Sequence, residues 1–154
     1  MKPRLNTWTA APQQMQAFVD FSNAMAKDGV EPSLAELVKI RASQINHCAF
    51  CLHMHTREAL AQGESEVRLT MLATWEESPL YTDRERAALA WTEALTLLPE
   101  TKAPDAVYAQ LAAHFTPEEQ TKLTVLIGII NAWNRLGVGF RSVHAVPHAE
   151  KAAA

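Results

Sequence analysis

Cysteine is scarce in this chain of 154 residues, which holds only two. Two thiols cannot supply the dense disulfide framework that stabilises many small secreted domains. The chain is nevertheless long enough to bury a hydrophobic core without such bridges. We therefore expect a single domain over residues 1–154, with its core at about 12–140 and a flexible tail at about 141–154.

Positive charge is not in excess either. Fourteen Lys and Arg residues face seventeen Asp and Glu residues, for a net charge of -3. Without a basic cluster, we expect no nucleic-acid partner. The first residues lack the apolar segment of a secretory signal. The longest apolar runs, such as 125–130, are shorter than a bilayer crossing requires, so we expect a cytoplasmic protein with no membrane partner.

Alternating patterns typical of β-strands are also missing, whereas helical signals recur along the chain. Pro12 opens a segment with apolar residues at helical spacing, and Gly29 closes it. Capping-box patterns predict three further helix starts, at Ser33, Thr82 and Thr116. The fold class is therefore predicted to be all-α, a compact domain of about seven helices.

The remaining helix boundaries follow from spacing and from glycine or proline stops. We expect one helix at about 48–62, a second that starts at Ser65 and a third at 105–114, with a loop at 75–81. The last helix is expected to end at Gly137.

The two cysteines, Cys48 and Cys51, form a C-x-x-C pair. In a reducing compartment such a pair is more often redox-active or metal-binding than structural. A disulfide across so short a loop also stabilises a fold only weakly. The turn predicted at Asn46 and His47 puts the pair at the start of a helix, with Cys51 one helical turn before His55.

This arrangement suits two-step thiol chemistry. The unpaired N–H groups of a first helical turn favour the thiolate of Cys48, whereas His55 can accept the proton of Cys51. A peroxide oxidises one sulfur to a sulfenic acid, and the second sulfur condenses with it to a disulfide and water. An external dithiol then restores the pair. The residues alone do not decide which sulfur reacts first.

Two other interpretations of the pair stay open. Cys48, Cys51 and His55 share a helical face and could bind zinc, with His47 or His53 nearby. Structural zinc usually takes four ligands in two separated pairs, and the sequence has no second such pair. The cysteines could also be small buried hydrophobic residues. We favour the redox interpretation over both.

Several segments resemble the carboxymuconolactone decarboxylase and alkyl hydroperoxidase D superfamily, in its C-x-x-C peroxidase-like branch. The resemblance implies an all-helical, homo-oligomeric antioxidant protein, a trimer or hexamer, which reduces peroxide with an external dithiol and binds no cofactor or metal. Two positions depart from the branch: Phe50 replaces an additional His, and His47 replaces a common Gly. The matching segments are Glu36–Arg41, Ser43–Asn46, Cys48–Cys51, His53–Thr56 with Glu58 and Ala59, and Asn131–Arg135.

The resemblance also implies separate roles for the site residues. Cys51 is the sulfur that peroxide oxidises, and Cys48 resolves it and exchanges with the reductant, which suggests that Cys48 is the more exposed. Glu36 and His55 form a proton relay. The residues alone favour Glu36 as the carboxylate of the Ser33 capping box. A straight helix would hold Glu36 about 22 Å from Cys51, so the relay requires the chain to reverse near Asn46 and His47.

The superfamily name leaves a lyase of the carboxymuconolactone decarboxylase kind as an alternative, and the zinc ligands leave a non-enzymatic zinc-binding module. Decarboxylation has no evident need for two thiols. Trp75, Trp91 and Trp133 lie in apolar helical patterns and are expected in the core, where they could also line a pocket for a hydrophobic hydroperoxide. His114, His144 and His148 have no ligand-like spacing.

Overall fold

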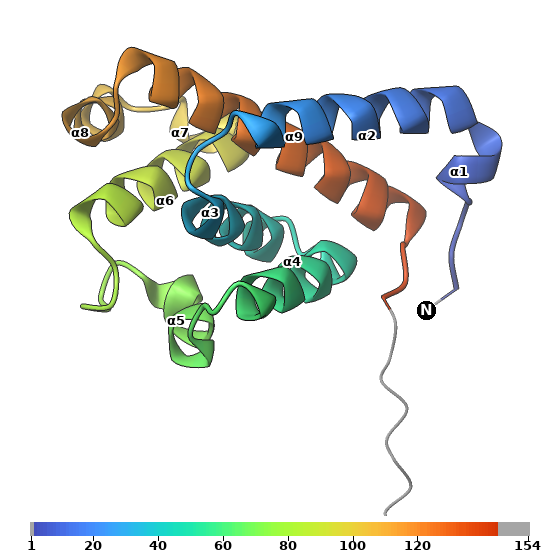
Figure 1. Cartoon of the computed structure of the whole chain (residues 1–154), viewed down its shortest axis with the longest axis horizontal. Coiled ribbons are helices and arrows are strands. Elements are labelled where there is room, and N and C mark those ends of the chain that lie inside the picture. Colours follow the sequence, from blue (N-terminus) through green and yellow to red (C-terminus); the bar gives the residue numbers. More distant parts are fainter. Residues whose placement is uncertain (1, 145–154) are drawn as a thin grey trace, which may run out of the picture.

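A computed structural model describes residues 2–144 of the chain. This part contains nine α-helices, one 3-10 turn and no β-strand, which confirms the all-α prediction (Figure 1). The two helices beyond the predicted seven are α1 (Thr7–Ala10) and α7 (Leu98–Thr101), each four residues long. Helices of one turn are too short to show an apolar periodicity in the sequence.

The longer helices lie close to their predicted ranges, and segment 75–81 contains no helix, as predicted. The capping boxes at Thr82 and Thr116 are both formed. The bounds are α2 Pro12–Lys27, α3 Pro32–Ile45, α4 Ala49–Ala61, α5 Glu66–Met71, the 3-10 turn Leu72–Thr74, α6 Asp83–Thr96, α8 Asp105–His114 and α9 Pro117–Phe140.

Two boundary predictions are wrong. The capping box at Ser33 does not form, because α3 begins at Pro32, whose fixed backbone angle suits the first helical position. Its N-cap is Glu31, which makes no side-chain cap. Gly137 does not end the last helix either, since α9 continues to Phe140. Of the predicted tail, residues 145–154 and with them His148 lie outside the described residues.

The helices pack around α9, which contacts α2, α3, α4, α6 and α8. One hydrophobic cluster joins α3, α6, α8 and α9, and a second joins α3 to α4, α5 and α6. Helix α2 crosses one side of the molecule, above α9 and α3 in the view of Figure 1. Met15 is the one buried residue among the sixteen of α2, so few side chains of this helix pack into the core.

Helix α9 is long and apolar enough to be a candidate membrane span by length and composition. Its buried side nevertheless carries polar side chains that pair with α3. Asn46 Nδ2 donates to Asn131 Oδ1 at 3.0 Å and to Asn134 Oδ1 at 2.9 Å, and Asn134 Nδ2 donates to Ser43 Oγ at 3.0 Å. These bonds, together with its five helical neighbours, identify α9 as the central helix of a folded domain.

The chain reverses between α3 and α4, as the proposed relay requires. Asn46 caps α3, and its side chain also donates to the carbonyl of Ala42 at 3.0 Å. His47 adopts a left-handed φ of 54°, and Cys48 N–H then donates to the carbonyl of Ser43 at 3.0 Å. The prediction that the C-x-x-C pair starts a helix after a helix–helix turn is thereby confirmed.

Candidate redox site

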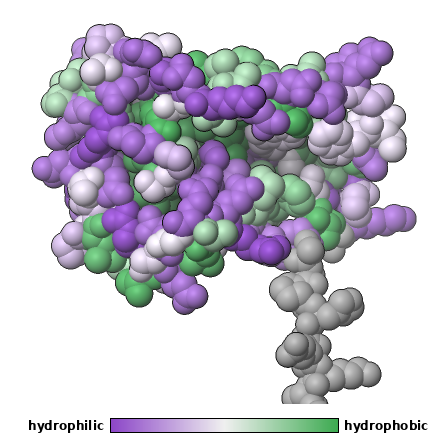
Figure 2. Space-filling view, viewed as in Figure 1, coloured by the Kyte–Doolittle hydropathy of each residue, from purple (hydrophilic) through white to green (hydrophobic). Residues whose placement is uncertain are grey.

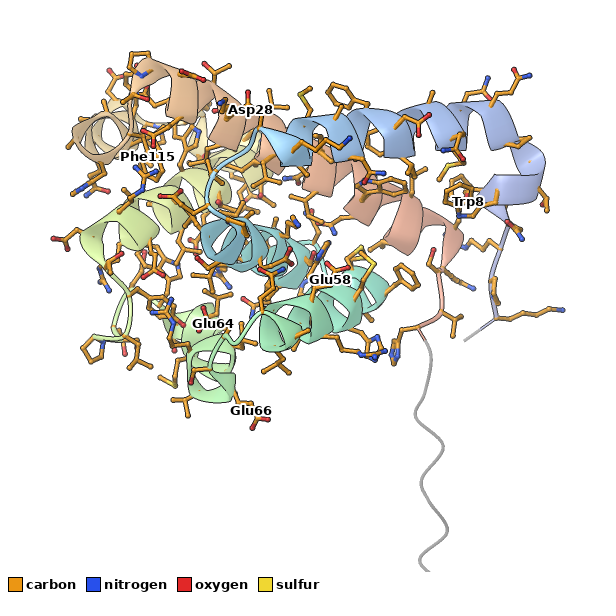
Figure 3. The ribbon with its side chains drawn as sticks, viewed as in Figure 1. Trp8, Asp28, Glu58, Glu64, Glu66 and Phe115 are labelled. Carbon is orange, nitrogen blue, oxygen red and sulfur yellow. A yellow bond between two sulfur atoms is a disulfide. The ribbon has the colours of Figure 1, made fainter. Side chains whose placement is uncertain are left out.

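Cys48 and Cys51 form a disulfide at the start of α4. Cys48 is the N-cap residue and Cys51 the third residue of the helix, because α4 begins at Ala49, one residue later than the predicted start at about Cys48. This placement brings their Cα atoms to 5.4 Å, within the range that a disulfide spans. The Cys51 N–H also donates to Cys48 Sγ at 3.4 Å. In Figure 3 the yellow disulfide lies between α4 and the last part of α9.

Both sulfur-bearing residues are buried under α9. Cys48 is 2% exposed and Cys51 4%, so the expectation that Cys48 is the more exposed is wrong. Helix α9 reaches the disulfide through Gly137. A Cβ at this position would lie 2.8 Å from Cys48 Sγ and 3.5 Å from Cys51 Sγ. Any larger residue would hold the two helices apart, which explains why this glycine lies inside a helix.

His55 lies one helical turn after Cys51, and a single nitrogen of its ring contacts two carboxylates. Nδ1 is 3.1 Å from Glu36 Oε2 and 2.9 Å from Glu58 Oε2. Because carboxylate oxygens only accept hydrogen bonds, Nδ1 must carry the proton. In the neutral ring, Nε2 is then unprotonated and can serve as a base. The two carboxylates therefore fix the tautomer that thiol activation needs.

Glu36 is buried, at 4% exposure, and has a cation beside it. Lys39 Nζ lies 2.6 Å from Glu36 Oε1, the oxygen that His55 does not contact. Burial alone raises the pKa of Glu36, but the hydrogen bonds from His55 and Lys39 outweigh it and hold the pKa below its ordinary value. Glu36 is thus an ionised acceptor for the Nδ1 proton.

A cavity of about 670 Å³ adjoins these groups, between α2, α3, α4 and α9. Cys51 lines it together with His55, Glu36, Lys39 and Glu58, whereas Cys48 does not. Figure 2 shows apolar residues in the hollow beneath α2, and Figure 3 shows Glu58 on α4 below the same helix. Of the two sulfurs, Cys51 is therefore the one open to a molecule in the cavity.

The structure unites the four predicted site residues, Cys48, Cys51, His55 and Glu36, but engages both sulfurs and the His53 ring of the alternative zinc set in other contacts. The two sulfurs are bonded to each other, and the His53 ring stacks on that of His144 with centroids 4.7 Å apart. Over residues 2–144, one group of metal-ligand type is found, Glu36 with His55 and Glu58. The Lys39 ammonium on Glu36 competes there with any cation.

Two polar residues of the site, Lys39 and Glu58, received no role from the sequence. Lys39 lies three positions after Glu36, and Glu58 lies three positions after His55. This spacing places each pair on one face of a helix, and it is the sequence signal that indicates both residues. Trp133, expected in the core, lines the cavity and donates from Nε1 to Ser22 Oγ at 3.1 Å.

Trp75 is buried in the second hydrophobic cluster, as predicted. Its Nε1 donates to Glu93 Oε1 at 2.6 Å, and the same oxygen accepts from Arg41 Nε at 2.7 Å. Arg41, which the resemblance had included, thus joins α3 to α6 away from the disulfide. Trp91 is partly buried against the first cluster.

Known proteins resemble the chain in sequence and in fold. Residues 12–94 match the carboxymuconolactone decarboxylase family. The chain is 36% identical over 138 residues to YdfG of Bacillus subtilis, an uncharacterized protein, and the match covers 90% of this chain and 94% of YdfG.

Solved structures extend the comparison. A protein of unknown function from Agrobacterium tumefaciens, provisionally described as an antioxidant defence protein AhpD, is 46% identical with a TM-score of 0.92 and covers 94% of this chain and 99% of its own. A peroxidase-related protein from Ralstonia eutropha, described as an alkylhydroperoxidase AhpD core, has a TM-score of 0.78 at 20% identity. It covers 90% of this chain and 74% of its own, and it shows the fold alone.

Proposed function

The chain belongs to the carboxymuconolactone decarboxylase family, and from this premise we propose that it is a thiol-dependent peroxidase with an antioxidant role. One observation carries the proposal: Cys51 lines a cavity with His55 and the buried Glu36, and its disulfide partner Cys48 lies behind it. A sulfur that can meet a substrate, a base with a fixed tautomer and a second sulfur in reach are the parts of a dithiol peroxidase.

In the first step, His55 Nε2 takes the proton of Cys51, and Glu36 and Glu58 stabilise the resulting imidazolium through Nδ1–H. The Cys51 thiolate attacks the outer oxygen of a hydroperoxide. An S–O bond forms, the O–O bond breaks, and the alkoxide leaves as an alcohol with the proton returned by His55. Cys51 is then a sulfenic acid.

In the second step, Cys48 attacks the Cys51 sulfur, and the sulfenic oxygen departs as water. The Cys51 N–H that donates to Cys48 Sγ favours the thiolate of Cys48 for this attack. An external dithiol, protein or small molecule, reduces the disulfide and closes the cycle. All electrons come from this dithiol, so the cycle needs no cofactor or metal, and the cytoplasm is the compartment that supplies it.

Thiol titration after single turnover tests the proposal. Reduced protein treated with one equivalent of hydroperoxide should lose two thiols and recover both with dithiothreitol. The C51S variant should not react above the background rate of a free thiol, and C48S should stop at a sulfenic acid that an alkylating dione traps. The control is A49S, which alters an exposed residue between the cysteines and keeps both sulfurs. Undiminished turnover in C51S or C48S would contradict the mechanism.

We also propose that the protein is a homo-oligomer, a trimer or hexamer. Helix α2 supports this, because it leaves the large apolar side chains of Phe21 and Met25 exposed. Sedimentation velocity across a range of protein concentrations tests the proposal, and a monomer at all of them would contradict it.

A further inference from the structure

We propose that the external dithiol reduces the disulfide by attacking Cys51 from the cavity, and that Cys48 is the sulfur that is released. This inference rests on the proposed peroxidase function and concerns the second half of its cycle. It departs from the resemblance, which gives the exchange with the reductant to Cys48. Three features carry it: the access to each sulfur, the donor beside the released sulfur and the base beside the attacked one.

Cys48 lies in a closely packed part of the interior. It belongs to a buried cluster with Ala42 and Ile130, and the backbone of Gly137 lies against its sulfur. Even a Cβ on Gly137 would come within 2.8 Å of Cys48 Sγ. Close-packed interiors leave few voids as large as a water molecule, so on this side a thiol has no room beside Cys48 unless α9 moves.

Cys51 is the sulfur that a reductant in the cavity can meet. It lines the cavity of about 670 Å³ between α2, α3, α4 and α9, and Cys48 does not. This volume lies within the range of pockets that bind small organic molecules. The rate of thiol–disulfide exchange depends on access to the attacked sulfur, so the position of the cavity favours attack on Cys51.

The sulfur that leaves also influences the rate, because exchange is faster when the released thiol has a lower pKa. Cys48 is the N-cap residue of the thirteen-residue helix α4, the end of a helix at which a negative charge is favoured. The N–H of Cys51 donates to Cys48 Sγ at 3.4 Å, so a hydrogen-bond donor is already in place. Attack on Cys51 therefore releases a sulfur whose negative charge is stabilised.

His55 can activate the incoming thiol. It lines the same cavity as Cys51, and the contacts of Nδ1 with Glu36 and Glu58 leave Nε2 unprotonated in the neutral ring. In the disulfide form Cys51 has no proton to give, so Nε2 is free to accept one from the reductant. The same base thus serves both halves of the cycle.

In the first reductive step, one thiol of the dithiol gives its proton to His55 Nε2, and its sulfur attacks Cys51. A new S–S bond joins the reductant to Cys51, the Cys48–Cys51 bond breaks, and the electron pair stays on Cys48. The second thiol then attacks the reductant's own sulfur, which closes the reductant's disulfide and releases Cys51. Two electrons and two protons pass from the dithiol to the protein, which ends with two thiols.

Trapping of the mixed disulfide tests the inference without any peroxide. The disulfide form of the full chain is mixed with 2-mercaptoethanol, a monothiol that lacks the second thiol of the cycle. Samples are quenched at early times with excess N-ethylmaleimide, which labels the released cysteine. Tandem mass spectrometry distinguishes the two cysteines, because Ala49 and Phe50 separate them. We expect mercaptoethanol on Cys51 and maleimide on Cys48, in about tenfold or greater excess over the reverse.

A matched pair of variants on α4 tests the route through the cavity. Met54 and Leu60 are similarly exposed, at 37% and 38%, and of the two only Met54 lines the cavity. Met54 lies three positions after Cys51, on the same side of the helix. M54W should lower the rate of reduction by 2-mercaptoethanol about fivefold, because the larger side chain narrows the approach to Cys51. L60W should leave this rate within about twofold of the wild type.

Mercaptoethanol found on Cys48, or in equal amounts on both sulfurs, would overturn the inference. Equal rates for M54W and L60W would overturn it as well. None of these outcomes touches the peroxide step, because no peroxide is present. Failure of the proposed function has a different signature: reduced protein that keeps both thiols after one equivalent of hydroperoxide.

Discussion

Glu36 has a different partner on each of its carboxylate oxygens. Oε2 accepts from His55 Nδ1, and Oε1 accepts from the ammonium of Lys39. Burial disfavours a charge at this position, so the two donors together keep Glu36 ionised. Lys39 does not touch the cysteines, and we regard it as a positioning residue that acts through Glu36.

Replacement of Lys39 by methionine should therefore change the pH dependence of thiol oxidation. Without the ammonium, less opposes the cost of burying the Glu36 charge, and the pKa of Glu36 rises. Protonated Glu36 no longer stabilises the imidazolium of His55, so the acid limb of the rate profile should move to higher pH. Single-turnover rates between about pH 5 and pH 8 should fall several-fold at the acid end and change little at the alkaline end.

The control for this experiment is K39R, which keeps a cation at the same place and should retain most of the wild-type profile. A purely structural role for Lys39 would lower the rate at every pH without moving the limb. An acid limb of K39M that coincides with that of the wild type would contradict the assignment.

The turn between α3 and α4 contains a backbone strain at His47, the position where the resembled branch commonly has Gly. His47 adopts a φ of 54°, in the left-handed region that favours glycine, and its side chain is exposed. A non-glycine residue in this region costs about 1 kcal/mol. The turn is nevertheless formed, because Asn46 and the backbone of Cys48 bind α3 and α9 on either side of His47.

Replacement of His47 by glycine should raise the free energy of unfolding by about 1 kcal/mol, because it removes the strain and costs no buried contact. Urea unfolding at neutral pH measures the effect. H47A is the matched control, since alanine loses the same side chain but keeps the positive φ. A gain in H47A as large as that in H47G would show that the imidazole, and not the backbone, is responsible.

The contact between α9 and α4 depends on a glycine. A Cβ on Gly137 would lie 2.8 Å from Cys48 Sγ, well inside van der Waals contact. G137A should therefore lower the free energy of unfolding of the oxidised protein by about 1–3 kcal/mol, as expected for overpacking.

Gly128 provides the control on the same helix, because a Cβ there has no atom within 4 Å. G128A should be neutral or stabilise the protein by up to about 1 kcal/mol through higher helix propensity. Urea unfolding of both variants in the oxidised form measures these changes in the free energy of unfolding. Equal stability of G137A and G128A would contradict the close packing of α9 on the disulfide.

At the scale of the whole molecule, the guanidinium of Arg84 links the N-terminal ends of α3 and α9. Arg84 on α6 contacts Glu31, the N-cap of α3, at 2.9 Å and Glu119, in the first turn of α9, at 2.7 Å. The Arg84 guanidinium holds the pKa of Glu31 below its ordinary value. The backbone N–H of Thr116, followed by Arg84, does the same for the pKa of Glu119.

Lowered carboxylate pKa values make the fold sensitive to acid. A group whose pKa is lower in the folded protein stabilises the fold above its unfolded pKa, and this contribution is lost as the pH falls through the folded pKa. The urea concentration at the unfolding midpoint should therefore decrease once the pH is lowered below about 5, because Glu31, Glu36 and Glu119 then become protonated.

The Arg84→Met variant measures how much of this acid sensitivity comes from the ion pairs of Arg84 with Glu31 and Glu119. It should unfold at lower urea concentration than the wild type at neutral pH, and its midpoint should then fall less steeply on acidification. Glu36, whose partners are unchanged, and Glu119, which keeps its hydrogen bond from the Thr116 N–H, supply the remaining dependence. Parallel curves for the two proteins would contradict the role of Arg84.

The local features of this protein could be predicted from its sequence. Helix starts at Thr82 and Thr116, the loop at 75–81 and the C-x-x-C pair at the start of a helix depend on spacing and capping within a few residues. The proximity of Cys51 and His55 also follows from the period of one helix. Such interactions act between near neighbours in the chain, so the order of residues is sufficient to determine them.

Only the tertiary structure decided how these parts work together. It placed Glu36, which the residues alone favoured as a helix cap and the resemblance as a relay partner, beside His55, 19 residues away, and added Lys39 and Glu58. It buried Cys48 under Gly137 and opened Cys51 to an apolar cavity between α2 and α9. These features arise where helices distant in sequence pack together, and the shape of that packing depends on all of their side chains at once.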